Sequence, residues 1–318
     1  MNKNLSLFSI LLFFFFLCSS IFWMAGVSIA QQNPQYNQYM FNPLIVNPAY
    51  AGSKEQLSVV ALHRSQWIGF EGAPMTQTLA IHAPFRKRSV GLGANIINDK
   101  IGPTNNLGIL VAYAYRIRVG PGKLSFGLRS GAYNYAFHWN KIDYKDQNEF
   151  AGLDTRSNRW IPIFDYGMRY HTNNFYAGFT MANINRPIIR IRDSADSTRF
   201  SSVLNRYVNL TAGYAQVVAD NVVFRPSIFI KVLKGQRPTV DANASFLLKR
   251  NLWLGLSYRT GRTFVAITEY KISAFVSAGY SFDYSLNKLR TFNSGSHEIF
   301  ISYEVPFKKS RVLSPRYF

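Results

Sequence analysis

Apolar and polar residues alternate with a period of two along most of the chain after residue 56. In residues 274–284 one face carries Ala, Val, Tyr and Phe, whereas the other carries mainly Ser, Gly and Asp. The same alternation recurs at 90–96, 208–215 and 252–259. Successive side chains of a β-strand point to opposite faces. Membrane barrel strands alternate lipid-facing apolar residues with small or polar lumen residues, so the pattern indicates this class of all-β protein.

About fourteen segments show this alternation. They span residues 56–67, 74–84, 88–98, 104–118, 122–139, 160–172, 175–183, 202–218, 221–233, 237–249, 251–260, 263–271, 273–285 and 296–307. An even number of strands closes an antiparallel barrel. The sequence therefore predicts a transmembrane antiparallel β-barrel over residues 56–307.

The lengths of the connections alternate in step with this topology. With the amino-terminal end of the barrel in the periplasm, the inner turns are short, and the longest connections, 140–159, 184–201 and 286–295, are all outer loops. Outer-membrane barrels have short periplasmic turns and longer outer loops. The competing interpretation is a soluble β-sandwich, which would have to cover an apolar face on every strand.

Residues 1–30 have the composition of a signal peptide. Lys3 precedes a long apolar run, and the small residues Ser28 and Ala30 occupy the two positions that a signal peptidase reads for cleavage after Ala30. An uncleaved membrane anchor and a lipoprotein modified at Cys18 remain as alternatives, although Leu17 is large for a lipobox. We therefore expect export.

Composition narrows the class further. The formal net charge is +20, aromatic residues make up 16% of the chain, and Cys18 is the single cysteine. Cleavage after Ala30 would remove it, so the mature chain would contain neither a disulfide nor a thiolate metal site. No later segment approaches the roughly 18 uninterrupted apolar residues of a membrane helix. These features favour an exported β-structured protein in contact with outer-membrane lipid.

Residues 31–55 form neither a regular strand nor a helix by pattern, yet they are too apolar for a solvated linker. Two Asn-Pro steps, at Pro43 and Pro48, remove backbone donors and favour extended or turn geometry. We predict that this segment is a hatch that plugs the lumen. Its candidate residues are Tyr39, Phe41, Asn42, Pro43, Asn47, Pro48, Ala49, Tyr50 and Gly52.

A basic and aromatic run at the end of the first predicted strand is a candidate for locking the hatch. The residues are His63, Arg64, Gln66 and Trp67. Arg64 would donate to carbonyl groups that the prolines of the hatch leave without partners. The alternative is a recognition loop.

Basic residues gather at the predicted periplasmic rim and in the tail 308–318. The candidate docking residues are Arg86, Lys87, Arg88, Lys249, Arg250, Lys308 and Lys309. One hypothesis is that this rim binds an acidic periplasmic partner. The other is that basic residues only solvate the turns. Nucleic acid is excluded as a partner because the chain has no stacking platform or groove-reading helix.

No enzymatic motif emerges. The five histidines are scattered without metal-ligand spacing, and no HExxH, phosphate loop or nucleophile elbow is present. A Ser-x-x-Lys match from Ser285 to Lys288 falls at a strand end rather than on a helix. We therefore expect a non-enzymatic protein without a metal or cofactor.

Three motifs together resemble the PorP/SprF family of outer-membrane proteins, which are associated with type IX secretion and gliding motility. They are PQYNQYMFNPLIVNPAYAG at Pro34 to Gly52, HRSQW at His63 to Trp67 with Gly69 and Pro74 after it, and SHEIFISYEV at Ser296 to Val305. The family is similar to fourteen-stranded fatty-acid-transporter barrels, whose hatch also carries an Asn-Pro-Ala motif, here Asn47 to Ala49.

The resemblance implies a component of the secretion machinery that anchors a secreted, adhesin-like surface protein and contacts periplasmic secretion components. The alternative is an outer-membrane transporter for hydrophobic or anionic small molecules. The two functions differ in the hatch, which is fixed in a scaffold and moves in a transporter.

Overall fold

The computed structural model describes residues 34–54, 56–85, 89–138, 141, 156–192 and 198–306. The predicted leader 1–30 and its cleavage site, the turn residues Arg86 to Arg88 and the tail 308–318 lie outside these ranges. No helix within them is long and apolar enough to cross a membrane.

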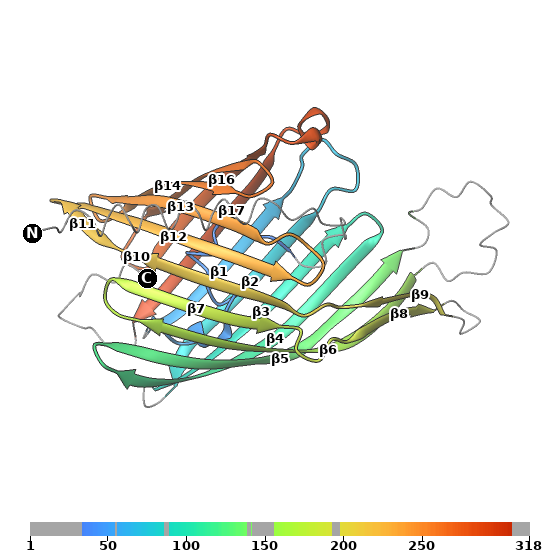
Figure 1. Ribbon diagram of the computed structural model, residues 1–318, viewed down its shortest axis with the longest axis horizontal. Coiled ribbons are helices and arrows are strands. Elements are labelled where there is room, and N and C mark those ends of the chain that lie inside the picture. The colour runs from blue at the N-terminus through green and yellow to red at the C-terminus, as the bar shows by residue number, and fades with distance from the viewer. Residues whose placement is uncertain are drawn as a thin grey trace, which may run out of the picture.

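Strands make up nearly all of the regular structure (Figure 1). They are β1 (Gln56–Ser65), β2 (Met75–Phe85), β3 (Val90–Ile101), β4 (Thr104–Val119), β5 (Gly122–His138), β6 (Arg156–His171), β7 (Phe175–Ala182), β8 (Ile188–Arg192), β9 (Thr198–Val203), β10 (Tyr207–Tyr214), β11 (Gln216–Ala219), β12 (Val222–Leu233), β13 (Thr239–Leu248), β14 (Leu252–Arg259), β15 (Thr263–Lys271), β16 (Val276–Ser285) and β17 (Ser296–Pro306). Two 3-10 helices are η2 (Pro48–Tyr50) in the hatch and η4 (Lys288–Phe292) before β17.

The main sheet closes on itself. Each wall strand pairs antiparallel with its neighbour, β1 pairs with β17, and β10 pairs with both β7 and β12. Of the fifteen segments in this sheet, β10 and β11 both pair with β12 and form one wall strand that is interrupted at the buried Ala215. The described residues therefore form a closed barrel of fourteen antiparallel strands, as the alternation predicted.

The outside of the barrel is apolar and the inside is polar. In β14, Leu254 and Leu256 are exposed, whereas Ser257 and Arg259 point inward and are buried. The same division holds around the wall, because large aliphatic or aromatic side chains are exposed on most wall strands and many of the buried side chains are charged or polar. A soluble β-sandwich has the opposite arrangement, so the structure supports the membrane interpretation.

The two ends of the barrel differ. Short turns join β4 to β5, β6 to β7, β11 to β12 and β13 to β14 at one end, where β11 lies on the left of Figure 1. The β8–β9 hairpin and the connection from β16 to β17 belong to the opposite end. Because outer-membrane barrels keep their short turns in the periplasm, we place the short-turn end there.

Three parts of the structure have strand or loop boundaries that differ from the predicted ones. β6 begins at Arg156, so the outer loop before it is shorter than predicted. The predicted outer loop 184–201 contains β8 and most of β9, which pair only with each other among the described residues. The segment 202–218 is divided among the end of β9, β10 and β11. Alternation with a period of two identifies a strand but not the strand that it pairs with. The sequence therefore could not show that β8 and β9 form a hairpin of their own outside the barrel wall.

Cysteine labelling tests the assignment of faces and ends. We expect Leu256→Cys to react with a lipid-soluble maleimide but not with a charged one, because this residue is 70% exposed on the apolar face. Arg250→Cys, on the short β13–β14 turn, should react with the charged reagent only when it reaches the periplasm. Labelling of Arg250→Cys on intact cells would contradict the orientation.

Candidate functional site

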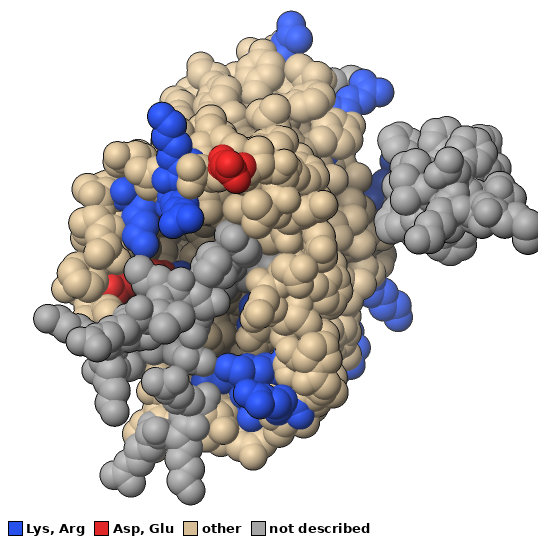
Figure 2. All heavy atoms as spheres, turned by 90° about the vertical axis from the view of Figure 1, so that its left-hand side faces the viewer, with Lys and Arg blue, Asp and Glu red and all other residues tan. Residues whose placement is uncertain are grey.

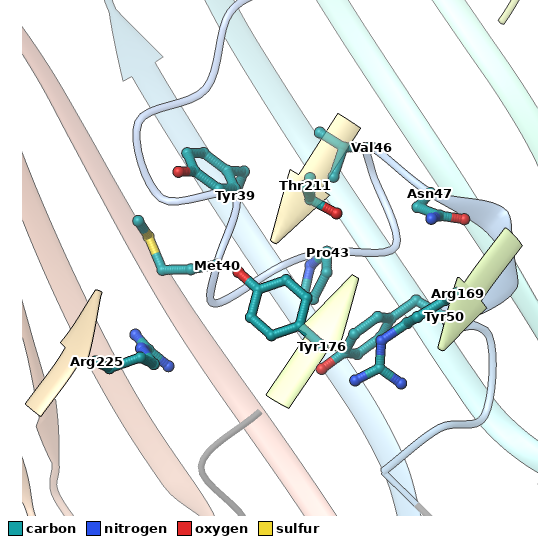
Figure 3. Close-up of a pocket in the computed structure, with 10 residues that line it drawn as sticks. All are labelled: Tyr39, Met40, Pro43, Val46, Asn47, Tyr50, Arg169, Tyr176, Thr211 and Arg225. Atoms are coloured by element: carbon teal, nitrogen blue, oxygen red, sulfur yellow. The ribbon is translucent and has the colours of Figure 1, made fainter. Parts of the chain in front are cut away.

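The segment 34–54, which we call the hatch, lies inside the barrel lumen and is mostly irregular. All nine predicted hatch residues are buried except Pro43, which is half-buried. Figure 3 shows the hatch as a looped chain in front of the barrel strands, with side chains reaching toward the wall. Its carbonyl and amide groups are therefore removed from water and need partners from the barrel.

Asn47 organises the Asn-Pro-Ala motif. Its side-chain oxygen accepts a hydrogen bond from the Ala49 N–H at 2.9 Å and so caps η2, and Pro48 occupies the first turn of that helix. Its amide nitrogen donates to the carbonyl oxygens of Met168 in β6 at 3.0 Å and Phe179 in β7 at 3.3 Å. One side chain thus both shapes the hatch and ties it to two wall strands.

A carboxylate holds the amino-terminal part of the hatch. Both oxygens of Glu298 in β17 accept backbone N–H groups, from Asn37 at 3.0 Å and Gln38 at 2.8 Å. Arg64 of β1 lies beside this carboxylate at 3.3 Å and pairs with Asp283 of β16 at 2.6 Å.

The side chain of Asn37 extends the same network. It donates to Asp283 at 2.8 Å and accepts from Arg259 of β14 at 3.0 Å. Arg259 in turn pairs with Asp241 of β13 at 2.7 Å. Five wall strands therefore contribute charged groups to the attachment of Asn37 and Gln38.

Two arginines bind carbonyl groups farther along the hatch. Arg129 of β5 donates to the carbonyl oxygens of Leu44 at 3.1 Å and Ile45 at 2.8 Å, and it pairs with Asp165 of β6. Arg116 of β4 donates to the carbonyl oxygen of Ala51 at 2.6 Å. The hatch is thus bonded to the wall on both sides of its proline-rich middle.

Glycines in the wall let the hatch approach closely. A Cβ atom on Gly91 of β3 would lie 2.0 Å from the Ala51 carbonyl oxygen, and one on Gly127 of β5 would lie 2.2 Å from the Ala49 nitrogen. A Cβ on Gly167 of β6 would lie 2.2 Å from the Asn47 side-chain oxygen. Only glycine leaves room for the hatch backbone at Gly91 and Gly127 and for the Asn47 side chain at Gly167.

Aromatic contacts fill the remaining space. The Phe41 ring stacks on Phe300 of β17 at 5.5 Å, and Tyr39 packs against Phe229 of β12 at 4.8 Å between ring centroids. Burial raises the pKa of the Tyr39 hydroxyl well above its usual value, so this group stays neutral. These contacts anchor the hatch through shape as well as through hydrogen bonds.

An apolar cluster lies between the hatch and the outer end, along strands β3 to β6. Ile189 of β8 and Leu204, just after β9, are buried against Ile97, Leu110, Ile161 and Ile163 of the lumen wall, with Tyr133, Tyr135 and Phe137 packed around them. The base of the β8–β9 hairpin therefore folds inward over the lumen. We call this set the outer apolar cluster.

A small cavity of about 30 Å³ separates part of the hatch from β6, β7, β10 and β12. Figure 3 shows its lining, with the side chains of Arg169 and Arg225 on different sides of the hatch loop. Arg169 lies over the Tyr50 ring at 4.2 Å, and Arg225 lies over the Trp253 ring at 3.9 Å.

The four predicted locking residues, at the end of β1 and directly after it, have different surroundings. Arg64 and Gln66 are buried, and Arg64 pairs with the carboxylates of Asp283 and Glu298 instead of hatch carbonyls. His63 faces outward and contacts Ser65, since adjacent residues of a strand point to opposite faces. Trp67 lies beyond β1, with φ 47°, and its N–H bonds to Ser296.

The groups that bind the hatch carbonyls, Arg116 and Arg129, were not singled out in the sequence. The sequence did contain a signal for these two arginines, because each lies on the lumen face of its strand directly after small residues. In β4, Arg116 follows Ala112 and Ala114 on that face, and in β5, Arg129 follows Ser125 and Gly127. Charge on the lumen face of a membrane strand is expensive unless it is paired, so such positions mark contacts.

Of the predicted docking residues, the structure describes Lys249 and Arg250, which are exposed on the β13–β14 turn. Arg86, Lys87, Arg88, Lys308 and Lys309 lie outside the described residues. Figure 2 looks onto the short-turn end, where Lys and Arg side chains gather around a hollow. Within the described part of the chain, no group of three His, Cys, Asp or Glu residues could hold a metal ion.

The family model described as type IX secretion system membrane protein PorP/SprF matches residues 28–303. The chain belongs to the PorP/SprF family. Together with the closed barrel, this membership makes the chain an outer-membrane component of the type IX secretion system. The matched region contains the whole hatch and nearly the whole barrel.

Solved structures share the barrel with this PorP/SprF chain. The CymD monoaromatic hydrocarbon channel is 13% identical, with a TM-score of 0.50, and the match covers 88% of this chain and 95% of that one. The Ralstonia pickettii toluene transporter TbuX is 10% identical, with a TM-score of 0.49 and coverages of 83% and 93%. A Pseudomonas aeruginosa FadL homologue is 10% identical, with a TM-score of 0.46 and coverages of 80% and 89%. No curated protein matches.

The attachment of Asn37 and Gln38 predicts a strong effect of Glu298→Gln. The substitution removes the charge that faces Arg64, and breaking a buried ion pair costs roughly 3–5 kcal/mol. We expect faster hydrogen exchange in residues 34–41 and a lower free energy of unfolding. Ser302→Ala, on the same face of β17, is the control. Equal exchange in both variants would contradict the attachment.

The glycine contacts predict that Gly91→Val displaces the carboxyl-terminal end of the hatch, because the new side chain would occupy the position of the Ala51 carbonyl. We expect protease cleavage within 44–54 while the heat resistance of the barrel on gels persists. Leu92→Val, on the lipid face of the same strand, should leave the hatch protected. A protected hatch in Gly91→Val would show that the wall can move instead.

Proposed function

We propose that this PorP/SprF chain is a non-enzymatic scaffold, which holds a secreted, adhesin-like surface protein at its outer end and contacts periplasmic secretion components at its inner end. On this proposal the barrel does not conduct solutes. Surface display of the adhesin-like protein would link the chain to gliding motility.

The observation that carries the proposal is the network of bonds that holds the hatch in the lumen. The hatch is bonded to β17 through Glu298, to β5 through Arg129 and to β4 through Arg116. A solute that displaced the hatch would have to break several buried, charge-assisted hydrogen bonds, which favours a fixed hatch.

The outer end offers a structured surface for a protein partner. The β8–β9 hairpin lies next to the outer half of β6 (Figure 1), and the chain before it bonds to that half, from Ile184 N–H to the Phe164 carbonyl at 2.9 Å. Ile188, Val203 and Trp160 are exposed there. Apolar and aromatic groups on a rigid base are typical anchors of protein interfaces.

The inner end supports the second contact through charge. Lys249 and Arg250 are exposed on a short periplasmic turn, and other basic residues surround the hollow seen in Figure 2. A basic rim attracts an acidic partner and speeds its association at low ionic strength. In this proposal Arg86, Lys87, Arg88, Lys308 and Lys309 belong to the same rim.

Crosslinked affinity purification tests the outer contact. In Ile188→Asp with Val203→Asp, two paired positions of the hairpin change from apolar to charged. We expect recovery of the secreted partner to fall by about tenfold or more, as for loss of an interface anchor. Leu286→Asp, on the connection between β16 and β17, should keep normal recovery. Full recovery with the altered hairpin would contradict docking at this surface.

A chain that lacks residues 34–54 separates the scaffold from a transporter. The scaffold predicts an open, conducting barrel only after this deletion, with no ligand-dependent current through the intact protein in planar bilayers. Current that appears in the intact protein on addition of a hydrophobic or anionic solute would favour the transporter instead.

A further inference from the structure

The lipid-facing surface of β13 to β16 contains a groove of about 440 Å³. These strands are consecutive in the sheet, and β13, β14 and β16 lie together on one side of the barrel in Figure 1. Short side chains and longer ones both line the groove, namely Ala244, Ala266 and Thr268, and Leu254, Leu256 and Tyr280. Its volume is in the range of pockets that hold a small organic molecule.

Strand register explains why the groove forms. On the outer face of β15, Ala266 lies directly opposite Leu256 of β14. Thr268, the next residue on this face, lies opposite Leu254 of β14 and Tyr280 of β16. A strand with short side chains between neighbours with long ones leaves a channel along its own direction. The floor of the groove therefore follows β15.

The lipid face of β4 shows the contrast. Its consecutive outward residues are large and exposed, namely Ile109, Val111, Tyr113 and Tyr115. Lipid tails can cover such an even surface without taking one fixed position, whereas a channel gives a single tail contacts on three sides. The groove over β15 is therefore shaped for one extended apolar chain.

The groove lies in the half of the bilayer that faces the periplasm. Thr268 comes three residues before Lys271, the last residue of β15. At about 3.4 Å per residue this separation is roughly 10 Å along the strand, and less in depth because the strand is tilted. The apolar band of a barrel is about 25 Å tall, so Thr268 lies in its inner half.

The periplasmic end of the groove has the character of a membrane–water boundary. Tyr270 and Lys271 are exposed at the end of β15, and the turn after them carries Ile272 and Phe275, which are 60% and 47% exposed. Tyrosine is enriched at this boundary, and apolar side chains beside basic ones enter the region between head groups and tails. Lys271 therefore lies at the level of the lipid head groups.

Arg250 brings a second positive charge to the same place. The Lys271 N–H donates to the carbonyl oxygen of Asn251, the residue after Arg250, at 2.8 Å. Arg250 and Lys271 are both exposed, and neither makes an ion pair within the part of the chain that the structure describes. Two cations thus stand at the open end of an apolar groove.

We propose that this groove binds one phospholipid from the periplasmic leaflet of the outer membrane. One acyl chain lies along β15 over Ala266 and Thr268, and the phosphate lies at Arg250 and Lys271. An apolar chain joined to an anionic phosphate matches both the apolar groove and the charge at its end. The inference depends on the orientation of the barrel in the membrane and not on any protein partner.

Native mass spectrometry of the mature protein tests the proposal. After removal of lipid in neutral detergent, the protein is titrated with phosphatidylglycerol that carries palmitoyl and oleoyl chains, and we expect one molecule to bind before any other. Glycerol phosphate, which has no acyl chain, should not bind. Dioleoylglycerol, which has no phosphate, should bind about tenfold or more weakly.

Filling the groove locates the acyl chain. Ala266→Leu with Thr268→Leu occupies its floor without adding charge to the lipid face, and we expect the affinity for phosphatidylglycerol to fall by about tenfold or more. Ala94→Leu is the matched control, since Ala94 lies on the lipid face of β3 and outside the groove. If the double variant loses the heat resistance of the barrel on gels, Ala244→Leu narrows the groove from β13 and should also weaken binding.

Removing charge locates the phosphate. Lys271→Gln should weaken the binding of phosphatidylglycerol by about fivefold, and adding Arg250→Gln should weaken it further. Lys271 decides this point, because Arg250 is also one of the predicted docking residues. Lys100→Gln is the control, since Lys100 is exposed at the outer end of β3.

Several outcomes would overturn the inference. Equal affinity of the filled groove and the parent protein would place the lipid elsewhere, and unchanged affinity without Arg250 and Lys271 would remove the phosphate site. A dimer that the filled groove dissociates would assign this face to a second copy of the chain. Loss of secreted-partner recovery with normal lipid binding would count against the scaffold and not against this site.

Discussion

The structure depends on the need to satisfy the backbone of an irregular segment that is buried inside a membrane barrel. The prolines at 43 and 48 prevent the hatch from forming a strand or a long helix, so its N–H and C=O groups cannot all pair within the segment. In the barrel these groups meet charged side chains of the wall, above all Glu298 for N–H groups and Arg129 for carbonyl groups. The lumen is polar and charged for this reason.

The same constraint explains how charges are distributed. Lumen arginines stand beside carboxylates of neighbouring strands, as Arg129 does with Asp165. Arg129 also donates to the hatch carbonyls of Leu44 and Ile45, whereas Asp165 accepts the Asn183 N–H. Removing one partner would leave a buried charge uncompensated, which makes the hatch a cooperative part of the wall. Such a plug suits a protein that holds partners at its two ends. Among the described residues, Arg169 has no carboxylate within 4 Å and lies over the Tyr50 ring of the hatch.

A second feature of the fold is the path of the chain on the outer side of the hatch, between β7 and β10. The barrel wall is short at β7, which ends at Ala182, and the chain then leaves the wall to form the β8–β9 hairpin. Ile189 and Leu204 return to the lumen and complete an apolar cluster there. One excursion therefore both adds apolar side chains to the lumen wall and carries the exposed Ile188 and Val203 at the outer end.

Much of the fold could be predicted from the sequence, because strand periodicity is local. The division of Leu254 and Ser257 between lipid and lumen follows from alternation alone, and the burial of Asn47 and Tyr50 follows from apolar residues next to helix-breaking prolines. The partners of the hatch could not be predicted, since Asn37 and Glu298 are 261 positions apart. Alternation placed Arg64 on the lumen face but did not show that Asp283 and Glu298 would surround it.

The sequence by itself determined that this chain is a fourteen-stranded barrel with a buried hatch, because side-chain period, proline positions and turn lengths act over a few residues. Only the tertiary structure decided which wall charges bind the hatch, that the base of the β8–β9 hairpin packs against β3 to β6, and that Arg169 meets Tyr50. These contacts depend on strand register and barrel closure, which bring together residues from opposite ends of the chain.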